Sequence, residues 1–150
     1  SKDIGRIPFV TYLEGLVDAL KDSYGVDDDR VAFEIAVTPE DLTLNIETGI
    51  PCGLLVNELL SNSLKYAFPD GRTGRIRIEI GQTAPRNYTL VIADNGVGFP
   101  KDVDFRNTPS LGLQLVNNLV SQLDGEIVLD ASDGTKFSIR FAGIEEPVKK

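Results

Sequence analysis

Hydrophobic residues recur along the chain with two different periods, and these periods predict its elements. Over residues 9–24 apolar side chains return every three or four positions, the spacing of one buried helix face. Over residues 31–46 they alternate with polar ones on either side of Pro39-Glu40-Asp41. This alternation predicts a strand, a turn and a strand, and hence a hairpin.

The same patterns predict two more helices and two more pairs of strands. Pro51 opens the second helix, because its fixed φ and missing N–H suit a first helical turn, and residues 68–71 end it. Strands follow at residues 75–80 and 88–93. A third helix at residues 111–123 precedes the last pair of strands, at residues 126–129 and 135–141. The charged tail, residues 145–150, is expected to fray.

The order of these elements predicts the fold class. Strands come in adjacent pairs between helices, which disfavours a sheet of alternating parallel strands. The pattern fits an α/β (α+β) two-layer sandwich, in which a mixed, largely antiparallel sheet carries helices on one face. At this length, residues 1–150 are expected to form one domain. The start at Ser1 and Lys2 is expected to be either an internal cut in a longer protein or a scar left by cloning.

Composition excludes several classes of function. A formal net charge of -8 argues against a nucleic-acid surface, which needs clustered Lys and Arg. No segment approaches the roughly 20 apolar residues of a membrane span, so we expect no membrane contact. The single cysteine, Cys52, is expected in the core and fits a reducing cytoplasm. Because the chain has no histidine, it cannot hold a phosphohistidine, and because it also has only one cysteine, a structural zinc site is excluded.

The second predicted helix carries polar side chains on one face. Glu58, Asn62 and Lys65 are spaced by four and three residues, so they share a stripe, and Tyr66 follows it. A carboxylate, a carboxamide and an ammonium group offer ligands for hydrated Mg²⁺ and a donor for phosphate. Taken alone, the stripe is better explained as a solvated polar face.

Three segments containing glycine follow. In Asp94-Asn95-Gly96-Val97-Gly98-Phe99 the glycines permit close approach to a planar ligand and the Asp can accept from an exocyclic amine. This segment alone is just as well a turn. In residues 109–116, PSLGLQLV, the helix start could bind an anion, or Ser110 could be an ordinary N-cap. Asp133-Gly134-Thr135 alone indicates only a turn.

These four segments occur together and in one particular order. In the presence and order of these segments the chain resembles the catalytic domain of histidine kinases. That domain belongs to the ATPase superfamily of the Bergerat fold, which also holds DNA gyrase, the ninety-kilodalton heat-shock chaperones and MutL. NELLSNSLKYAF resembles the N box, DNGVGF and SLGLQLV the two glycine-rich boxes, and GTKF the last box. With YLEGLVDAL and the hairpin, which resemble the short-lid subfamily, the resemblance covers nearly the whole chain.

The resemblance implies roles for the polar stripe. Asn62 would bind the Mg²⁺ that bridges the phosphates, and Asn57 would support the same shell. Lys65 and Tyr66 would contact phosphates. Glu58 stands where the hydrolytic members of the superfamily keep a general base.

The resemblance also implies how the nucleotide is held on the other wall. Asp94 would accept from the adenine amino group, Gly96 and Gly98 would let the base lie against the backbone, and Thr135 would sit beneath it. The phosphates would meet a helix start formed by Ser110, Leu111, Gly112, Leu113, Gln114 and Leu115.

The lid and the helix start carry two further expectations. In the lid, residues 100–109, Arg106 rather than Lys101 is expected to touch the γ-phosphate. Ser110 departs from the glycine that usually begins this box, while Gly112 keeps the close approach.

The function implied is that of the Mg-ATP-binding catalytic domain of a two-component sensor histidine kinase. Its γ-phosphoryl group would pass to a histidine on a separate dimerisation domain, leaving ADP, and then to a response regulator. Two alternatives stay open: a free-standing serine kinase that inhibits a sigma factor, and a degenerate domain that binds nucleotide or a partner without catalysis. The KYAF ending and YLEGLVDAL favour the histidine kinase. The intact Asn62, Lys65 and Asp94 argue against decay.

Overall fold

A five-stranded sheet is built from strands whose apolar residues alternate toward one face. The computed structural model describes residues 5–144. The strand order is β2-β4-β5-β7-β6. β2 is parallel to β4, and the other neighbouring pairs are antiparallel, so the predicted mixed sheet is confirmed. The strands are β2 (Val31–Thr38), β4 (Gly74–Ala84), β5 (Asn87–Asp94), β6 (Glu126–Asp130) and β7 (Thr135–Ala142).

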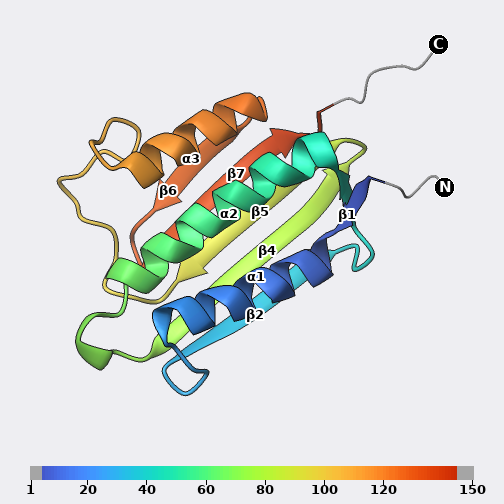
Figure 1. Cartoon of the computed structure of the whole chain (residues 1–150). Coiled ribbons are helices and arrows are strands. Elements are labelled where there is room, and N and C mark those ends of the chain that lie inside the picture. Colours follow the sequence, from blue (N-terminus) through green and yellow to red (C-terminus); the bar gives the residue numbers. More distant parts are fainter. Residues whose placement is uncertain (1–4, 145–150) are drawn as a thin grey trace, which may run out of the picture.

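Three helices lie on one face of this sheet: α1 (Phe9–Tyr24), α2 (Ile46–Tyr66) and α3 (Leu111–Gln122) (Figure 1). The core fills the space between the two layers. On the sheet side it holds Ile76, Ile78 and Leu90, which are fully buried, and on the helix side Leu13 and Leu55, which are also fully buried. No helix within residues 5–144 is long and apolar enough to span a bilayer.

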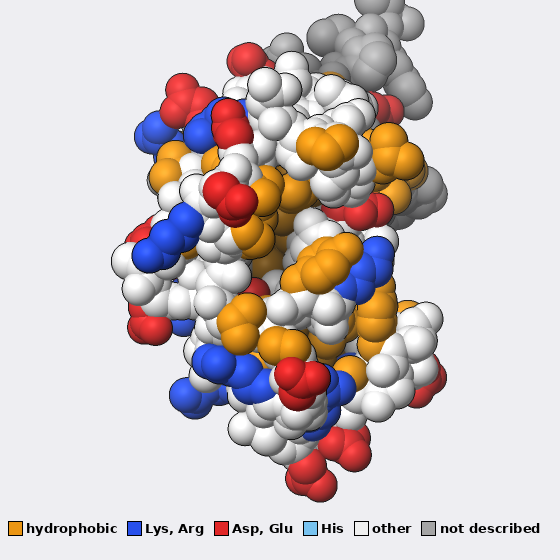
Figure 2. Space-filling model, turned by 90° about the vertical axis from the view of Figure 1, so that its left-hand side faces the viewer, with side chains coloured by type: hydrophobic (Ala, Val, Ile, Leu, Met, Phe, Trp, Pro, Cys, Tyr) orange, Lys and Arg blue, Asp and Glu red, His pale blue; other side chains and the backbone are white. Residues whose placement is uncertain are grey.

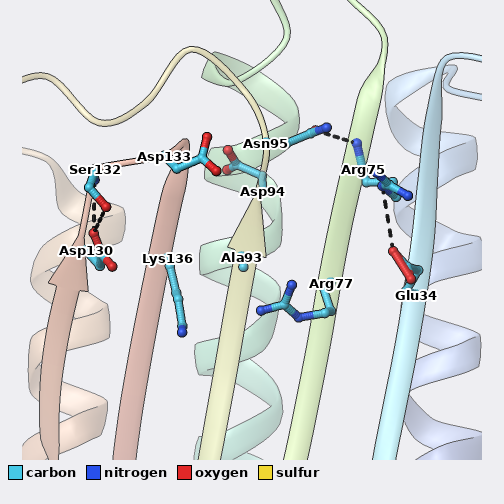
Figure 3. Close-up of a pocket in the computed structure, with 10 residues that line it drawn as sticks. All are labelled: Glu34, Arg75, Arg77, Ala93, Asp94, Asn95, Asp130, Ser132, Asp133 and Lys136. Carbon is cyan, nitrogen blue, oxygen red and sulfur yellow. Dashed lines mark hydrogen bonds and ion pairs between the residues drawn. The ribbon is translucent and has the colours of Figure 1, made fainter.

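The opposite face of the sheet is polar. Its outward side chains at one level, in strand order, are Glu34, Arg77, Ala93, Lys136 and Asp130 (Figure 3). Charged and small side chains of this kind can stay in water. The sheet therefore needs helices on one face alone, which explains the two-layer architecture.

The predicted hairpin at residues 31–46 is wrong, although both of its strands exist. The second strand, β3 (Thr43–Asn45), pairs with a short strand that the sequence did not predict, β1 (Arg6–Pro8). Leu42 and Leu44 are buried, and the N–H of Phe9 donates to the Leu42 carbonyl at 3.1 Å. Burial of these side chains near the start of α1 draws the segment away from β2, which pairs with β4 instead.

The second helix begins at Ile46, five residues before the predicted start at Pro51. Asn45 is its N-cap, because the Asn45 side chain accepts from the Thr48 N–H at 3.1 Å. Pro51 therefore lies inside the helix. The helix ends at Tyr66, and a single 3₁₀ turn, η1 (Pro69–Gly71), follows it.

Cys52 lies in the core, as predicted. Its side chain is fully buried on α2, and this burial raises the pKa of the thiol to about 12. The residues expected to mark an internal cut, Ser1 and Lys2, lie outside the described residues, and so does the charged tail at 145–150.

The N-cap of α2 can be tested by two substitutions. Asn45→Ala removes the acceptor for the Thr48 amide, and we expect it to lower the free energy of unfolding by about 0.5–2 kcal/mol. Asn45→Asp keeps that acceptor and loses only the amide that donates to the Ile144 carbonyl at 2.8 Å, so it should cost less. Urea denaturation measures both. Equal losses would mean that the Ile144 contact, and not the cap, is the stabilising interaction.

Candidate functional site

A cavity of about 490 Å³ opens between the C-terminal end of α2, the end of β5 and the loop before α3. Figure 2 looks at this end of the molecule, where hydrophobic side chains line a hollow. The apolar part of the wall consists of Leu59, Val97, Phe99, Val103, Leu113 and Phe137. A cavity of this size with mostly apolar walls and a few polar groups is typical of a small-molecule site.

Seven of the predicted site residues line this one cavity, although they come from four separate segments. They are Asn62, Tyr66, Asp94, Gly98, Ser110, Leu113 and Thr135. Packing of α2 and α3 over the sheet thus brings together the motifs that were singled out in the sequence.

The carboxylate of Asp94 is held by two hydrogen bonds at the end of β5. The side chain is buried, with 7% of its surface exposed. One oxygen, Oδ2, accepts from Ser63 Oγ at 2.8 Å, and the other, Oδ1, accepts from the Gly96 N–H at 2.9 Å. A carboxylate has about four acceptor positions, so Asp94 keeps the capacity to accept from a donor in the cavity. Thr135 stands opposite it on β7.

The backbone after β5 approaches α2 closely. The Val97 N–H donates to the Ala67 carbonyl at 2.9 Å, and a Cβ on Gly96 would lie 2.4 Å from that carbonyl oxygen. Gly98 has a φ of +92°, a value that L side chains rarely adopt. Glycine is therefore required at both positions. Gly98 lines the cavity, whereas Gly96 lies against the end of α2 behind it.

Ser110 is the N-cap of α3. Its Oγ accepts from the Leu113 N–H at 3.4 Å, and the Gln114 side-chain amide donates to the Thr108 carbonyl at 2.9 Å. The first N–H groups of a helix have no partner within the helix, and they carry the positive end of its dipole. Because Ser110 also lines the cavity, the start of α3 presents these groups at its rim.

Several predicted residues on α2 and α3 do not line the cavity. Those on α2 are Asn57, Glu58 and Lys65, and those on α3 are Leu111, Gly112, Gln114 and Leu115. A Cβ on Gly112 would come within 2.9 Å of a Glu58 carboxylate oxygen. Glu58 therefore lies beside the start of α3, one turn before Asn62.

Arg106 points away from the cavity. Its guanidinium donates to the Ile127 carbonyl on β6 and lies 4.4 Å from the centre of the Phe105 ring. Phe105 is buried and meets the Phe137 ring edge to face at 5.4 Å. Asn117 on α3 donates to the Phe105 carbonyl at 2.8 Å. The middle of the lid is thus anchored, and contact of Arg106 with a phosphate stays a prediction that requires this anchor to open.

Some cavity residues were missed in the sequence. Ser63 follows Asn62 directly, but its contact with Asp94 joins positions 31 residues apart and depends on how α2 packs. Phe137 could have been found, because it is an inward residue in the alternation of β7. It meets Phe99 edge to face at 6.0 Å, and together the two rings form an aromatic wall.

A second hollow, of about 480 Å³, lies on the outer face of the sheet (Figure 3). Its walls carry Arg75, Arg77 and Lys136 opposite carboxylates such as Glu34 and Asp130. None of its lining residues is aromatic, so it offers no apolar surface for a base. The cavity beside α2 is the better candidate for a ligand with a flat apolar part.

Within residues 5–144, no group of three or more Asp, Glu, His or Cys side chains could hold a metal ion. The site does fit Mg²⁺ that arrives with phosphates, because this ion keeps most of its waters and takes only one or two protein oxygens. Asn62 lines the cavity and has a side-chain oxygen that could be such a ligand.

An apolar cavity at the strand ends, with a buried carboxylate in its wall and a helix start at its rim, is a kind of site that suits a nucleotide. Residues 48–143 match the family described as Histidine kinase-, DNA gyrase B-, and HSP90-like ATPase. The chain belongs to this family.

Known histidine kinases are similar to this chain in sequence and in structure. The blue-light-activated histidine kinase 2 of Erythrobacter litoralis is 31% identical over 121 residues, which are 81% of this chain and 34% of that protein. The sensor histidine kinase PdtaS of Mycobacterium tuberculosis is 36% identical over 76 residues, 49% of this chain and 15% of that protein. The solved histidine kinase domain of an Erythrobacter litoralis blue-light-activated kinase matches with a TM-score of 0.78 at 28% identity, over 91% of this chain and 61% of that one. This chain therefore spans about a third or less of these two curated relatives.

The close approach at Gly96 can be tested against another glycine. Gly96→Ala places a methyl group against the Ala67 carbonyl, so we expect a loss of about 1–3 kcal/mol in the free energy of unfolding. Gly15→Ala is the control, because a Cβ there meets nothing within 4 Å inside α1. It should raise stability by about 0.5–1 kcal/mol. Denaturant titration measures the free energy of unfolding of both variants and of the wild type. An unchanged Gly96→Ala protein would refute the close packing of this loop.

Proposed function

We propose that the cavity binds Mg-ATP and that the chain is the catalytic domain of a two-component sensor histidine kinase. The observation that carries this proposal is Asp94, a buried carboxylate fixed from both sides at the wall of an apolar cavity. Adenine has two flat apolar faces and an amino group that donates. It would lie between the backbone at Gly98 and the Phe99–Phe137 wall, with its amino group on Asp94 and Thr135 nearby.

The phosphates would extend from the base toward the start of α3. The N–H groups of that helix start favour an anion there. Asn62 would supply an oxygen to Mg²⁺, with Asn57 in support, and Lys65 and Tyr66 on the last turn of α2 would contact phosphate oxygens. When bound, Mg²⁺ neutralises charge on the phosphates, and the protein supplies position and orientation.

The phosphoryl acceptor must lie outside this chain, because the chain contains no histidine. We propose that the acceptor is a histidine on a separate dimerisation domain, that ADP is released, and that a cytoplasmic response regulator takes the phosphoryl group in turn. Glu58, beside the start of α3, is the candidate general base. This arrangement leaves the chain itself unphosphorylated.

Phosphotransfer in trans tests the function. Incubated alone with γ-labelled ATP and Mg²⁺, the chain should take up no label that is acid-labile and base-stable, because it has no acceptor histidine. With the histidine-bearing domain of a related kinase, such a label should appear on that partner. The Asp94→Ala variant is the control and should transfer little. Label on a serine of a partner protein would favour the serine kinase instead.

Nucleotide binding with and without metal tests Asn62. Asn62→Ala should weaken ATP binding about tenfold in Mg²⁺ and change it far less in EDTA, because the lost oxygen is a metal ligand. Asn118→Ala, an exposed asparagine on α3, is the matched control and should bind as the wild type does. Calorimetry measures all three proteins. Equal weakening of Asn62→Ala in both buffers would show that Asn62 supports the structure and not the metal.

A further inference from the structure

Ser63 touches the proposed adenine acceptor, Asp94, through its hydroxyl. It lies on α2 directly after Asn62, is buried with 8% of its surface exposed, and lines the cavity. Its Oγ donates to Asp94 Oδ2 at 2.8 Å. This bond joins α2 to the end of β5 inside the cavity wall, where it fixes one side of the Asp94 carboxylate.

The bond fixes what this corner of the cavity offers to a ligand. A serine hydroxyl has one proton, and here that proton is committed to Asp94. Toward the cavity Ser63 is therefore an acceptor. Asp94 is likewise an acceptor, and its second oxygen is held by the Gly96 amide at 2.9 Å. The carboxylate cannot turn without breaking one of these two hydrogen bonds.

We propose that Ser63 is a positioning residue that sets selectivity for a purine with an amino group at position 6. By donating to Asp94, Ser63 holds the carboxylate in the orientation that accepts from this amino group. It also keeps its own proton away from the ligand, so a purine with an oxygen at position 6 meets acceptors only. This inference rests on the proposed binding of ATP in this cavity.

Two ligands distinguish an effect of Ser63 on recognition of the 6-amino group from an effect on the shape of the cavity. Purine riboside triphosphate carries a hydrogen where ATP carries the 6-amino group, and it is otherwise identical. If Ser63 acts through Asp94, its loss should weaken ATP and spare this analogue. A residue that merely supports the wall would affect both ligands alike.

The experiment titrates wild type and Ser63→Ala with both triphosphates in Mg²⁺ by calorimetry. We expect Ser63→Ala to weaken ATP about tenfold and to leave the analogue within about twofold, so that the preference for ATP largely disappears. Ser61→Ala, a serine on the same helix that does not line the cavity, is the matched control and should keep the preference. Ser63→Thr, which retains the hydroxyl, should show the wild-type preference for ATP. Unchanged ATP affinity in Ser63→Ala, or equal weakening of both ligands, overturns the proposal.

Two further measurements keep the result decisive. If Ser63→Ala does not fold, as judged by its thermal transition without nucleotide, then Ser63→Cys, which has a similar size but is a weak donor, should show the same ATP-specific loss. In an Asp94→Ala background, adding Ser63→Ala should change ATP affinity no further, and an additional loss there overturns the proposal.

If the wild type binds neither triphosphate, the proposed function is wrong, and the proposed role of Ser63 is wrong with it. If the wild type prefers ATP and Ser63→Ala keeps that preference, the role of Ser63 alone fails.

Discussion

The Val97 amide donates to the Ala67 carbonyl, and this hydrogen bond ties the loop after β5 to the C-terminal end of α2. The site depends on this junction. It sets the distance between helix and strand end, and so brings Ser63 within 2.8 Å of Asp94. Gly96 makes the approach possible, because any side chain there would collide with the same carbonyl. Two elements that form one cavity wall must be held at a fixed distance, and here a hydrogen bond between two backbone groups holds them.

The cavity follows from the one-sided architecture of the sheet. On the inward face of the sheet α1 lies against β2, α2 against β5 and α3 against β6. At the strand ends the rings of Phe99 and Phe105 both meet the ring of Phe137 on β7 edge to face. Phe105 is buried and held through its carbonyl by Asn117, so part of the lid belongs to the core. The apolar wall of the site is therefore continuous with the packing that stabilises the fold.

The sequence was most informative where a pattern is long or a motif is local. The helix at residues 9–24 and the strand at 88–93 were predicted to within one residue at each end, because each shows several turns or alternations of one period. The strand predicted at 75–80 runs on to Ala84, through residues that were expected to form the connection with β5. The start of α2 was missed, because Pro51 fits a first turn and yet lies inside the helix after the cap at Asn45. The partner of β3 was missed because β1 has only three residues. Asp94 and Asn62 were found through motifs, whereas the Ser63 contact and the anchored Arg106 are products of tertiary packing that no local pattern encodes.

The burial of Cys52 insulates the chain from redox chemistry. The thiolate is the species that reacts with oxidants and disulfides, and with a pKa near 12 almost none is present at neutral pH. The side chain is also sealed between the helices and the sheet. Because this is the only sulfhydryl in the chain, and methionine is absent as well, this chain offers oxidants no accessible sulfur while it stays folded. Reaction of the Cys52 thiol with such a reagent would therefore indicate that the helices had separated from the sheet.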